Sequence, residues 1–278
     1  MTLSYIDWNI NPEIFNFFGI PVRYYGLLFA GGLLICSYVL TWIFKKENLP
    51  QADLNKLFVY GFISIFLGAR LGHCLFYEPT YYLSHPLEIF LPIHLLPDGG
   101  IDYIGFQGLA SHGGTLGLII AMVIYSFKTK EPILKTLDIV AIVAPLGACF
   151  IRLANFMNSE IIGIPTTVPW AFVFRRVDNL PRHPAQLYEA IVYLFIFFFV
   201  FFLYRTQSIR LNRGVFFGFT LSLIFTARFF IEFIKEKQVE FEEQMKLDMG
   251  QLLSLPLILT AVGFIVNGLR KGSLPADI

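Results

Sequence analysis

Long apolar stretches alternate with short polar segments along almost the whole chain. A helix that crosses a bilayer takes about 20 predominantly apolar residues. Windows of that kind predict seven membrane-spanning helices, at residues 24–44, 57–77, 107–127, 136–156, 187–204, 214–231 and 250–269. The third and fourth are the weakest, because they are rich in glycine and interrupted by polar residues. We therefore expect an all-α integral membrane protein, a single polytopic domain over residues 1–278 with a small external loop region.

The composition narrows the class of protein further. Hydrophobic residues make up 56% of the 278 residues and charged residues only 15%, whereas soluble domains carry about 25% charged residues. The formal net charge of +1 argues against nucleic-acid binding, which needs a basic surplus. The three cysteines lie inside apolar runs without metal-binding or redox spacing, so we expect them to pack in the interior.

Basic residues are distributed unevenly between the two sides of the predicted bundle. The connections on one side carry 11 of the 21 Lys and Arg residues, all in short segments: Lys45, Lys46, Lys56, Lys128, Lys130, Lys135, Arg205, Arg210, Arg213, Arg270 and Lys271. Short loops rich in Lys and Arg remain in the cytoplasm. The pattern predicts an N-terminus outside the cell and a C-terminus in the cytoplasm.

Three arginines, Arg70, Arg152 and Arg228, fall inside predicted spans, near the outer ends. An arginine at the centre of a membrane helix costs about 2.5–3.5 kcal/mol, so each needs pairing or hydration. Further polar residues lie at the outer beginnings of other spans: Tyr25, His112, Gln186, Glu189 and Gln251. A channel or pump needs polar groups through its full depth. The pattern therefore favours an active site on one side, in the outer third of the membrane.

Arginine is suited to phosphate because its planar guanidinium donates two parallel hydrogen bonds. Three arginines at one depth indicate a cluster that binds the phosphate of a phospholipid headgroup. Simpler alternatives exist for each residue. Arg228 and Glu232, at positions i and i+4, can form a structural ion pair, and Arg70 can extend to the headgroups of the bilayer.

The sequence Ser-His-Gly-Gly contains His112, which can be a hydrogen-bonded packing residue or a base that accepts a proton from a nucleophile. The small face formed by Gly113, Gly114 and Gly117 permits close helix packing or leaves room for a bulky ligand beside the histidine. The second histidine, His183, precedes Pro184, so it can be part of a helix cap and turn.

Several motifs occur in a fixed order along the chain. They are residues 23–27 (RYYGL), 67–72 (LGARLG) with Phe76 and Tyr77, 111–114 (SHGG), 152–160 (RLANFMNSE) with Gly163, 182–189 (RHPAQLYE), Arg228 with Glu232, and 249–251 (MGQ). This series resembles the bacterial phosphatidylglycerol–prolipoprotein diacylglyceryl transferase family. The chain departs from the family pattern at Ile151 and Ala154, where glycines are usual, and at Lys235, where many members have arginine. Lysine supplies charge but no bidentate fork.

The resemblance implies a transferase of the bacterial cytoplasmic (inner) membrane with its active site toward the outer leaflet. Its reaction moves the sn-1,2-diacylglyceryl group from phosphatidylglycerol to the lipobox cysteine thiol of a prolipoprotein. A thioether forms and glycerol phosphate is released, which is the first step of lipoprotein maturation. No cofactor, metal or nucleic acid is implied.

The resemblance also implies roles for individual residues. The catalytic residues are expected to be His112, Arg152 and Arg228, with the arginines on the headgroup phosphate. The residues expected to bind or orient substrate are Tyr25, Arg70, Asn155, Asn158, Glu160, Gly163, His183, Gln186, Glu189, Glu232 and Lys235. The substrate thiol can lose its proton to His112, by ionising to a thiolate that an arginine stabilises, or through a water relay, and the sequence does not choose among these routes.

Two other classes of function compete with this hypothesis. A transporter or lipid-handling protein could bind an anionic headgroup without chemistry, although the one-sided polar layer argues against transport. A structural scaffold would leave the three arginines within the membrane unexplained.

Overall fold

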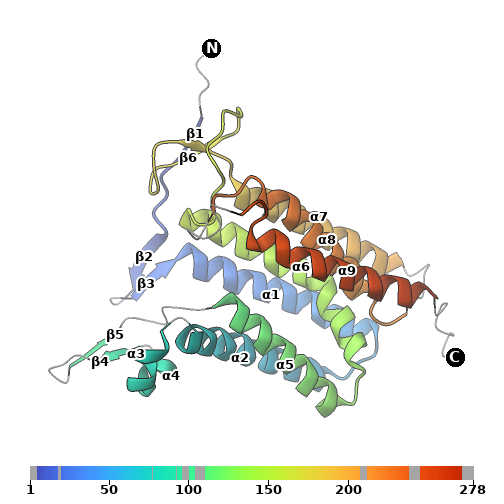
Figure 1. The fold of residues 1–278 in the computed structure, drawn as a ribbon. Coiled ribbons are helices and arrows are strands. Elements are labelled where there is room, and N and C mark those ends of the chain that lie inside the picture. The colour runs from blue at the N-terminus through green and yellow to red at the C-terminus, as the bar shows by residue number, and fades with distance from the viewer. Residues whose placement is uncertain are drawn as a thin grey trace. The chain divides into compact units, whose positions relative to one another are not determined.

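The computed structural model describes residues 5–17, 20–76, 78–91, 93–95, 100–103, 110–206, 212–237 and 245–270. Within these ranges the chain forms seven long helices (Figure 1): α1 (Tyr24–Lys46), α2 (Gln51–Phe76), α5 (Ser111–Thr129), α6 (Ile133–Asn158), α7 (Ala185–Thr206), α8 (Val215–Glu232) and α9 (Met249–Arg270). Two short helices, α3 (Pro79–Ser84) and α4 (Pro86–Phe90), follow α2.

Six of the long helices, all except α5, are long and apolar enough to cross a membrane. This confirms the expected all-α integral membrane protein. In α5 the apolar part is shorter, over Gly113–Thr129. Each predicted span overlaps one long helix, and their ends differ by six residues at most.

The chain divides into two compact units. The first combines Met1–Ile43 with Leu137–Ile278, and the second comprises Phe44–Thr136. The boundaries fall inside α1 and α6, so each of these helices contributes to both units.

In the second unit, α2 packs against α5 through glycines on both helices. A Cβ atom on Gly113 would lie 2.2 Å from the carbonyl oxygen of Gly68, and one on Gly117 would lie 2.1 Å from that of Ser64. Separations this short are possible only without side chains. Of the two interpretations of this small-residue face, the geometry supports close helix packing.

The first unit carries a small β-structure that the sequence analysis treated as loop. Strand β1 (Ile6–Trp8) pairs in parallel with β6 (Phe172–Phe174), which pairs antiparallel with β7 (Pro181–Arg182). A separate hairpin joins β2 (Glu13–Phe17) to β3 (Ile20–Arg23), directly before α1. In the second unit, β4 (Ile93–Leu95) pairs with β5 (Ile101–Tyr103).

An aromatic cluster fixes the three-stranded sheet to the end of α6. The ring of Phe156 lies 4.1 Å from that of Trp8 and 5.3 Å from that of Phe172, measured between centroids. Phe174 and Ile162 complete this buried cluster. The sheet therefore holds the end of α6, where the Arg152 motif lies, against the segment that leads into α7.

At its other end, α6 is joined to the beginning of α8 through a buried carboxylate. Asp138 accepts hydrogen bonds from the backbone N–H of Gly214 (2.6 Å, to Oδ2) and of Phe217 (2.8 Å, to Oδ1). The first N–H groups of a helix have no partner within the helix, so Asp138 caps α8 from another helix. Nearby, the Asn212 amide donates to the carbonyl of Gly268 in α9 (2.9 Å), and α8 packs between α7 and α9 (Figure 1).

We predict that Asp138→Ala lowers the free energy of unfolding by about 1–3 kcal/mol, because buried backbone N–H groups lose their acceptor. Thermal unfolding in detergent micelles measures the change. Asp53→Asn is the control, since Asp53 pairs with the exposed Lys56 on the same helix, and its effect should be smaller. Equal shifts for the two variants would contradict the capping role.

Candidate active site

A buried carboxylate lies at the centre of the polar residues of the first unit. Glu189, in the first turns of α7, has a solvent exposure of 0%. Its Oε2 lies 2.8 Å from Arg152 Nε of α6, and its Oε1 lies 2.9 Å from Lys235 Nζ. A buried charge is tolerated only when it is paired. Glu189 thus draws two cations from separate parts of the chain to one point.

Lys235 balances a second carboxylate as well. Its Nζ lies 3.1 Å from Glu232 Oε2, and its side chain is only 5% exposed. The lysine reaches this position because α8 ends at Glu232 and the chain turns back, forming a β-bridge from Lys235 to Gly163. Both groups paired with the Lys235 ammonium are carboxylates, so the lysine serves as their counter-ion. The expected contact of Lys235 with substrate stays a prediction.

Arg228 is held loosely in comparison. Its Nε lies 3.8 Å from Glu232 Oε2, and its side chain is 36% exposed, against 15% for Arg152. The expected i, i+4 pair with Glu232 is therefore present but long. Because Lys235 already neutralises Glu232, the guanidinium of Arg228 keeps N–H groups that can bind an anion.

The Arg152 motif forms a chain of hydrogen bonds. Arg152 Nη1 donates to Asn155 Oδ1 (3.2 Å), and Asn155 Nδ2 donates to Glu160 Oε2 (3.2 Å). Asn158 Nδ2 donates to the other oxygen of the same carboxylate (3.0 Å). In α7, Gln186 is fully buried and donates to the backbone carbonyl of Glu160. The motif therefore acts as one unit that orients Arg152 and Glu160.

The backbone beside Glu160 is unusual. Ser159 and Ile161 both have a φ of 57°, in the left-handed region. Such a conformation is costly for a β-branched residue such as Ile161, at about 1–3 kcal/mol. The strained turn reverses the chain after α6 and presents Glu160 to the two asparagines.

Gly163 lies where three segments meet. Its N–H donates to the His183 carbonyl (2.9 Å), and the N–H of Ile164 donates to the Ile234 carbonyl (2.9 Å). A Cβ atom on Gly163 would lie 2.6 Å from His183 Cβ and 2.7 Å from the Ile234 oxygen. Only glycine lets the chain pass this close to the residue before Lys235. This accounts for the glycine singled out in the sequence, although its expected role in binding substrate stays a prediction.

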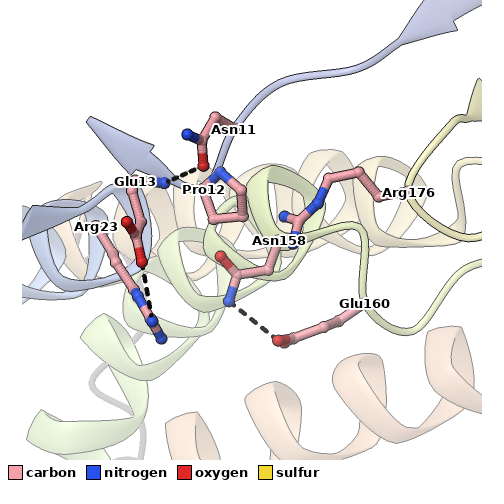
Figure 2. A pocket seen from close by; sticks show the side chains of 7 residues that line it. All are labelled: Asn11, Pro12, Glu13, Arg23, Asn158, Glu160 and Arg176. Carbon is pink, nitrogen blue, oxygen red and sulfur yellow. Dashed lines mark hydrogen bonds and ion pairs between the residues drawn. The ribbon is translucent and has the colours of Figure 1, made fainter. Parts of the chain in front are cut away.

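An open polar hollow of about 200 Å³ lies beside this motif (Figure 2). It is lined by Asn11, Pro12, Glu13, Arg23, Asn158, Glu160 and Arg176. Arg23 Nη2 lies 3.1 Å from Glu13 Oε1. In Figure 2, Arg176 extends from the loop after β6 toward Asn158 and Glu160. The hollow thus joins the N-terminal hairpin to the end of the Arg152 motif.

The remaining predicted residues have varied surroundings. Tyr25 in α1 lies within electrostatic range of Glu160 and Arg152. The His183 ring nitrogen Nδ1 lies 3.2 Å from the Tyr188 hydroxyl, and α7 begins two residues later, as expected for a cap and turn. Burial lowers the pKa of His183 below its usual value, so the ring is neutral at pH 7.

Arg70 belongs to the second unit, so its predicted convergence with Arg152 and Arg228 stays a prediction. It is 4% exposed and donates to the backbone carbonyls of Glu88 (2.6 Å) and Ile89 (3.1 Å). Its guanidinium also lies over the ring of Tyr82. These contacts fasten α4 to α2. His112 is in the first turn of α5, and its side chain lies outside the described part of the structure.

Three residues of this region received no role from the sequence, although one of them, Arg182, begins the 182–189 motif. The hydroxyl of Tyr193, one turn beyond Glu189, lies 3.5 Å from Glu189 Oε1 and within electrostatic range of Arg152 and Arg228. Its i+4 spacing from Glu189 was the available signal. The buried Arg182 donates to the Gly163 carbonyl and pairs with Glu236. Arg176 carried no signal, since an exposed loop arginine is ordinary.

Across the described ranges, the His, Cys, Asp and Glu side chains form no group of three or more that could hold a metal ion.

Comparison with known proteins gives one consistent result. Residues 12–267 match the family model described as prolipoprotein diacylglyceryl transferase. A protein of Bacteroides fragilis named phosphatidylglycerol–prolipoprotein diacylglyceryl transferase is 54% identical over 269 residues, which cover 97% of each chain. Proteins of the same name from Chloroherpeton thalassium and Porphyromonas gingivalis are 44% and 42% identical, each over 98% of both chains.

We predict that Glu189→Gln destabilises the fold by about 3–5 kcal/mol, because it leaves Arg152 and Lys235 buried without their shared anion. Chemical denaturation in micelles measures this. Glu131→Gln is the matched control, since it breaks a partly exposed i, i+4 pair with Lys135 that should contribute less than about 1 kcal/mol. A loss for Glu189→Gln no larger than the control would contradict the central role of this carboxylate.

We also predict that Gly163→Ala lowers turnover by about a hundredfold, the cost expected when a catalytic group is displaced by about 1 Å. The added methyl must push away the chain that carries Lys235. Gly31→Ala, where a Cβ atom meets open space, should have no such effect. Comparable activity in the two variants, at equal expression, would show that the close approach at Gly163 is dispensable.

Proposed function

The chain belongs to the prolipoprotein diacylglyceryl transferase family, and we propose that the charged cluster around Glu189 carries out its reaction. The enzyme transfers the diacylglyceryl group from phosphatidylglycerol to a prolipoprotein, the first step of lipoprotein maturation. The observation that carries the assignment to this cluster is the pairing of Arg152 and Lys235 with Glu189, which leaves Arg228 loosely held.

The reaction forms a carbon–sulfur bond and breaks a carbon–oxygen bond. The lipobox cysteine loses its proton, because the thiolate is the nucleophile, and its sulfur attacks the glyceryl carbon that bears the phosphate. The bond between that carbon and the phosphate oxygen breaks, and its electron pair leaves with glycerol phosphate. Negative charge grows on the departing phosphate, so donors placed beside it lower the barrier.

Arg228 and Arg152 are suited to different parts of this task. Arg228 is partly exposed and weakly paired, so it binds the headgroup phosphate directly. Arg152 is fixed by Glu189 on one side and Asn155 on the other, so it presents an oriented guanidinium as the leaving group departs. Tyr25, Asn155, Glu160 and Glu232 orient the lipid or the two arginines.

We assign to His112 the role of the base that accepts the thiol proton. Its support is the Ser-His-Gly-Gly motif at the start of α5 and the ability of a neutral imidazole to accept a proton at neutral pH. A His112→Gln variant that keeps near-normal turnover at normal expression would overturn this assignment.

The membrane arrangement that accompanies this function has seven spans. The six long apolar helices supply six of them, and α5 with its apolar part Gly113–Thr129 is the seventh. The 11 basic residues on one side support an N-terminus outside and a cytoplasmic C-terminus. In the bacterial inner membrane, this topology turns Arg152, Glu189 and Arg228 toward the outer leaflet.

A transfer assay tests the function. Purified protein is mixed with phosphatidylglycerol vesicles and a lipobox peptide, and the peptide is expected to gain the mass of one diacylglyceryl group. A peptide with serine in place of the cysteine should gain none. Lipid binding without any mass gain would favour a lipid-handling protein instead.

We predict that Arg228→Gln lowers kcat/KM for phosphatidylglycerol by about 10²–10³-fold, the usual cost of removing a donor to developing charge. Arg228→Lys should recover only part of the loss, because lysine lacks the bidentate fork. Arg205→Gln is the control, as Arg205 is exposed in the last turn of α7. The same assay measures all three, and unimpaired turnover by Arg228→Gln would remove Arg228 from the mechanism.

A further inference from the structure

We propose that the polar hollow between the N-terminal hairpin and the end of the Arg152 motif (Figure 2) binds the glycerol phosphate group. That group has two sources, the headgroup of bound phosphatidylglycerol and the glycerol phosphate released from it. The proposal rests on the proposed function, and it adds a site in which Asn11, Glu13, Arg23 and Arg176 take part.

The size of the hollow suits a small polar group. Its volume of about 200 Å³ is below the range of roughly 300–1,000 Å³ typical of sites for drug-sized ligands. A diacylglyceryl moiety or a folded peptide segment does not fit such a space. A glycerol phosphate, with ten heavy atoms, does.

The lining groups are complementary to a polyol phosphate. Among the described residues, Arg176 makes no hydrogen bond or ion pair, so its guanidinium is available to a phosphate. Glu13 and Glu160 supply oxygen acceptors for hydroxyl groups. With Arg23, the lining carries two positive and two negative side chains, which matches a ligand that has an anionic end and a neutral hydroxylated end.

One atom of the lining residues has no partner of its own. Asn158 Oδ1 is buried and accepts no hydrogen bond from any described residue, whereas Nδ2 of the same amide donates to Glu160. A buried acceptor without a donor costs about 1–3 kcal/mol. In Figure 2 the amide oxygen of Asn158 faces the side of Glu13 and Pro12, away from Glu160. The atom is closed to water in this structure, so a ligand hydroxyl would supply the missing donor only after the side chains around Asn158 move apart.

One residue that lines the hollow, Glu160, also belongs to the hydrogen-bonded chain that begins at Arg152. Glu160 lines the hollow, and its carboxylate accepts a hydrogen bond from Asn155 Nδ2. The side-chain oxygen of Asn155 in turn accepts a hydrogen bond from Arg152. A phosphate held by Arg176 would place its glycerol hydroxyls in the part of the hollow that Asn158 and Glu160 line. In this position the leaving group has its own polar compartment, separate from the apolar surroundings of the acyl chains.

The test uses the purified full-length protein in the transfer assay, with glycerol 1-phosphate added as an inhibitor. Arg176→Gln should raise the inhibition constant of glycerol 1-phosphate about tenfold, as expected for the loss of one charge-assisted hydrogen bond. Arg270→Gln, which removes an exposed arginine at the end of α9, should leave it unchanged. Inorganic phosphate should inhibit less strongly than glycerol 1-phosphate, because it lacks the hydroxyl groups.

A second variant tests the hydroxyl contacts. Asn158→Leu keeps the branching at Cγ and the number of side-chain heavy atoms but removes the amide, so it should reduce the advantage of glycerol 1-phosphate over inorganic phosphate. The KM for phosphatidylglycerol separates the two sources of the ligand. If the headgroup occupies the hollow before transfer, Arg176→Gln raises this KM together with the inhibition constant; if only the product does, the inhibition constant alone rises.

The outcomes distinguish the site from the function. Suppose that the wild-type protein transfers the diacylglyceryl group, but that the KM and the inhibition constant are unchanged in Arg176→Gln and Asn158→Leu. This result overturns the proposed site and leaves the proposed function intact. Turnover without any inhibition by glycerol 1-phosphate also overturns the site. Wild-type protein that transfers no diacylglyceryl group overturns the function, and the site with it.

Discussion

The carboxylate of Glu189 is completely buried in a helix that is apolar enough to cross a membrane, and this constraint organises the rest of the site. A carboxylate in such surroundings must be paired, and its partners come from α6 and from the segment after α8. Three elements are thereby tied together at one charge. Lys235 also forms an ion pair with Glu232. Of the three cations Arg152, Lys235 and Arg228, Arg228 therefore has the longest ion pair. Electrostatic balance within the protein thus leaves the guanidinium of Arg228 more weakly paired than that of Arg152.

The long helices were predictable because membrane insertion depends on local composition. A window of apolar residues such as 192–204 indicates a span regardless of its neighbours, and the ends of the predicted spans differ from those of the helices by at most six residues. The small sheet could not be predicted in this way. Its strands are two or three residues long, and β1 pairs with β6 across most of the chain, through Ile6 and Phe172. Nothing local in either segment specifies that partner.

The site could be predicted from the sequence where the contacting residues are close to one another along the chain. The links from Arg152 to Asn155 and from Asn155 to Glu160 lie within one motif, and helical spacing indicated the pairing of Arg228 with Glu232. The position of Lys235 was not predictable, because its partner Glu189 lies 46 residues away. The strained turn at Ile161 was hidden for a different reason. A β-branched residue is among the least expected at a positive φ, so tertiary contacts must impose that conformation against local preference.

The cap that Asp138 places on α8 has a consequence for the opposite end of the same two helices. Arg152 follows Asp138 by fourteen residues in α6, and Arg228 follows Gly214 by fourteen residues in α8. Fourteen residues make almost four helical turns, at about 3.6 residues per turn. Each arginine therefore lies almost four helical turns along its own helix from the Asp138 cap. A single residue inserted into either stretch would turn its arginine by about 100° about the helix axis. The number of residues between the cap and each arginine thus sets the direction in which the guanidinium points from its helix.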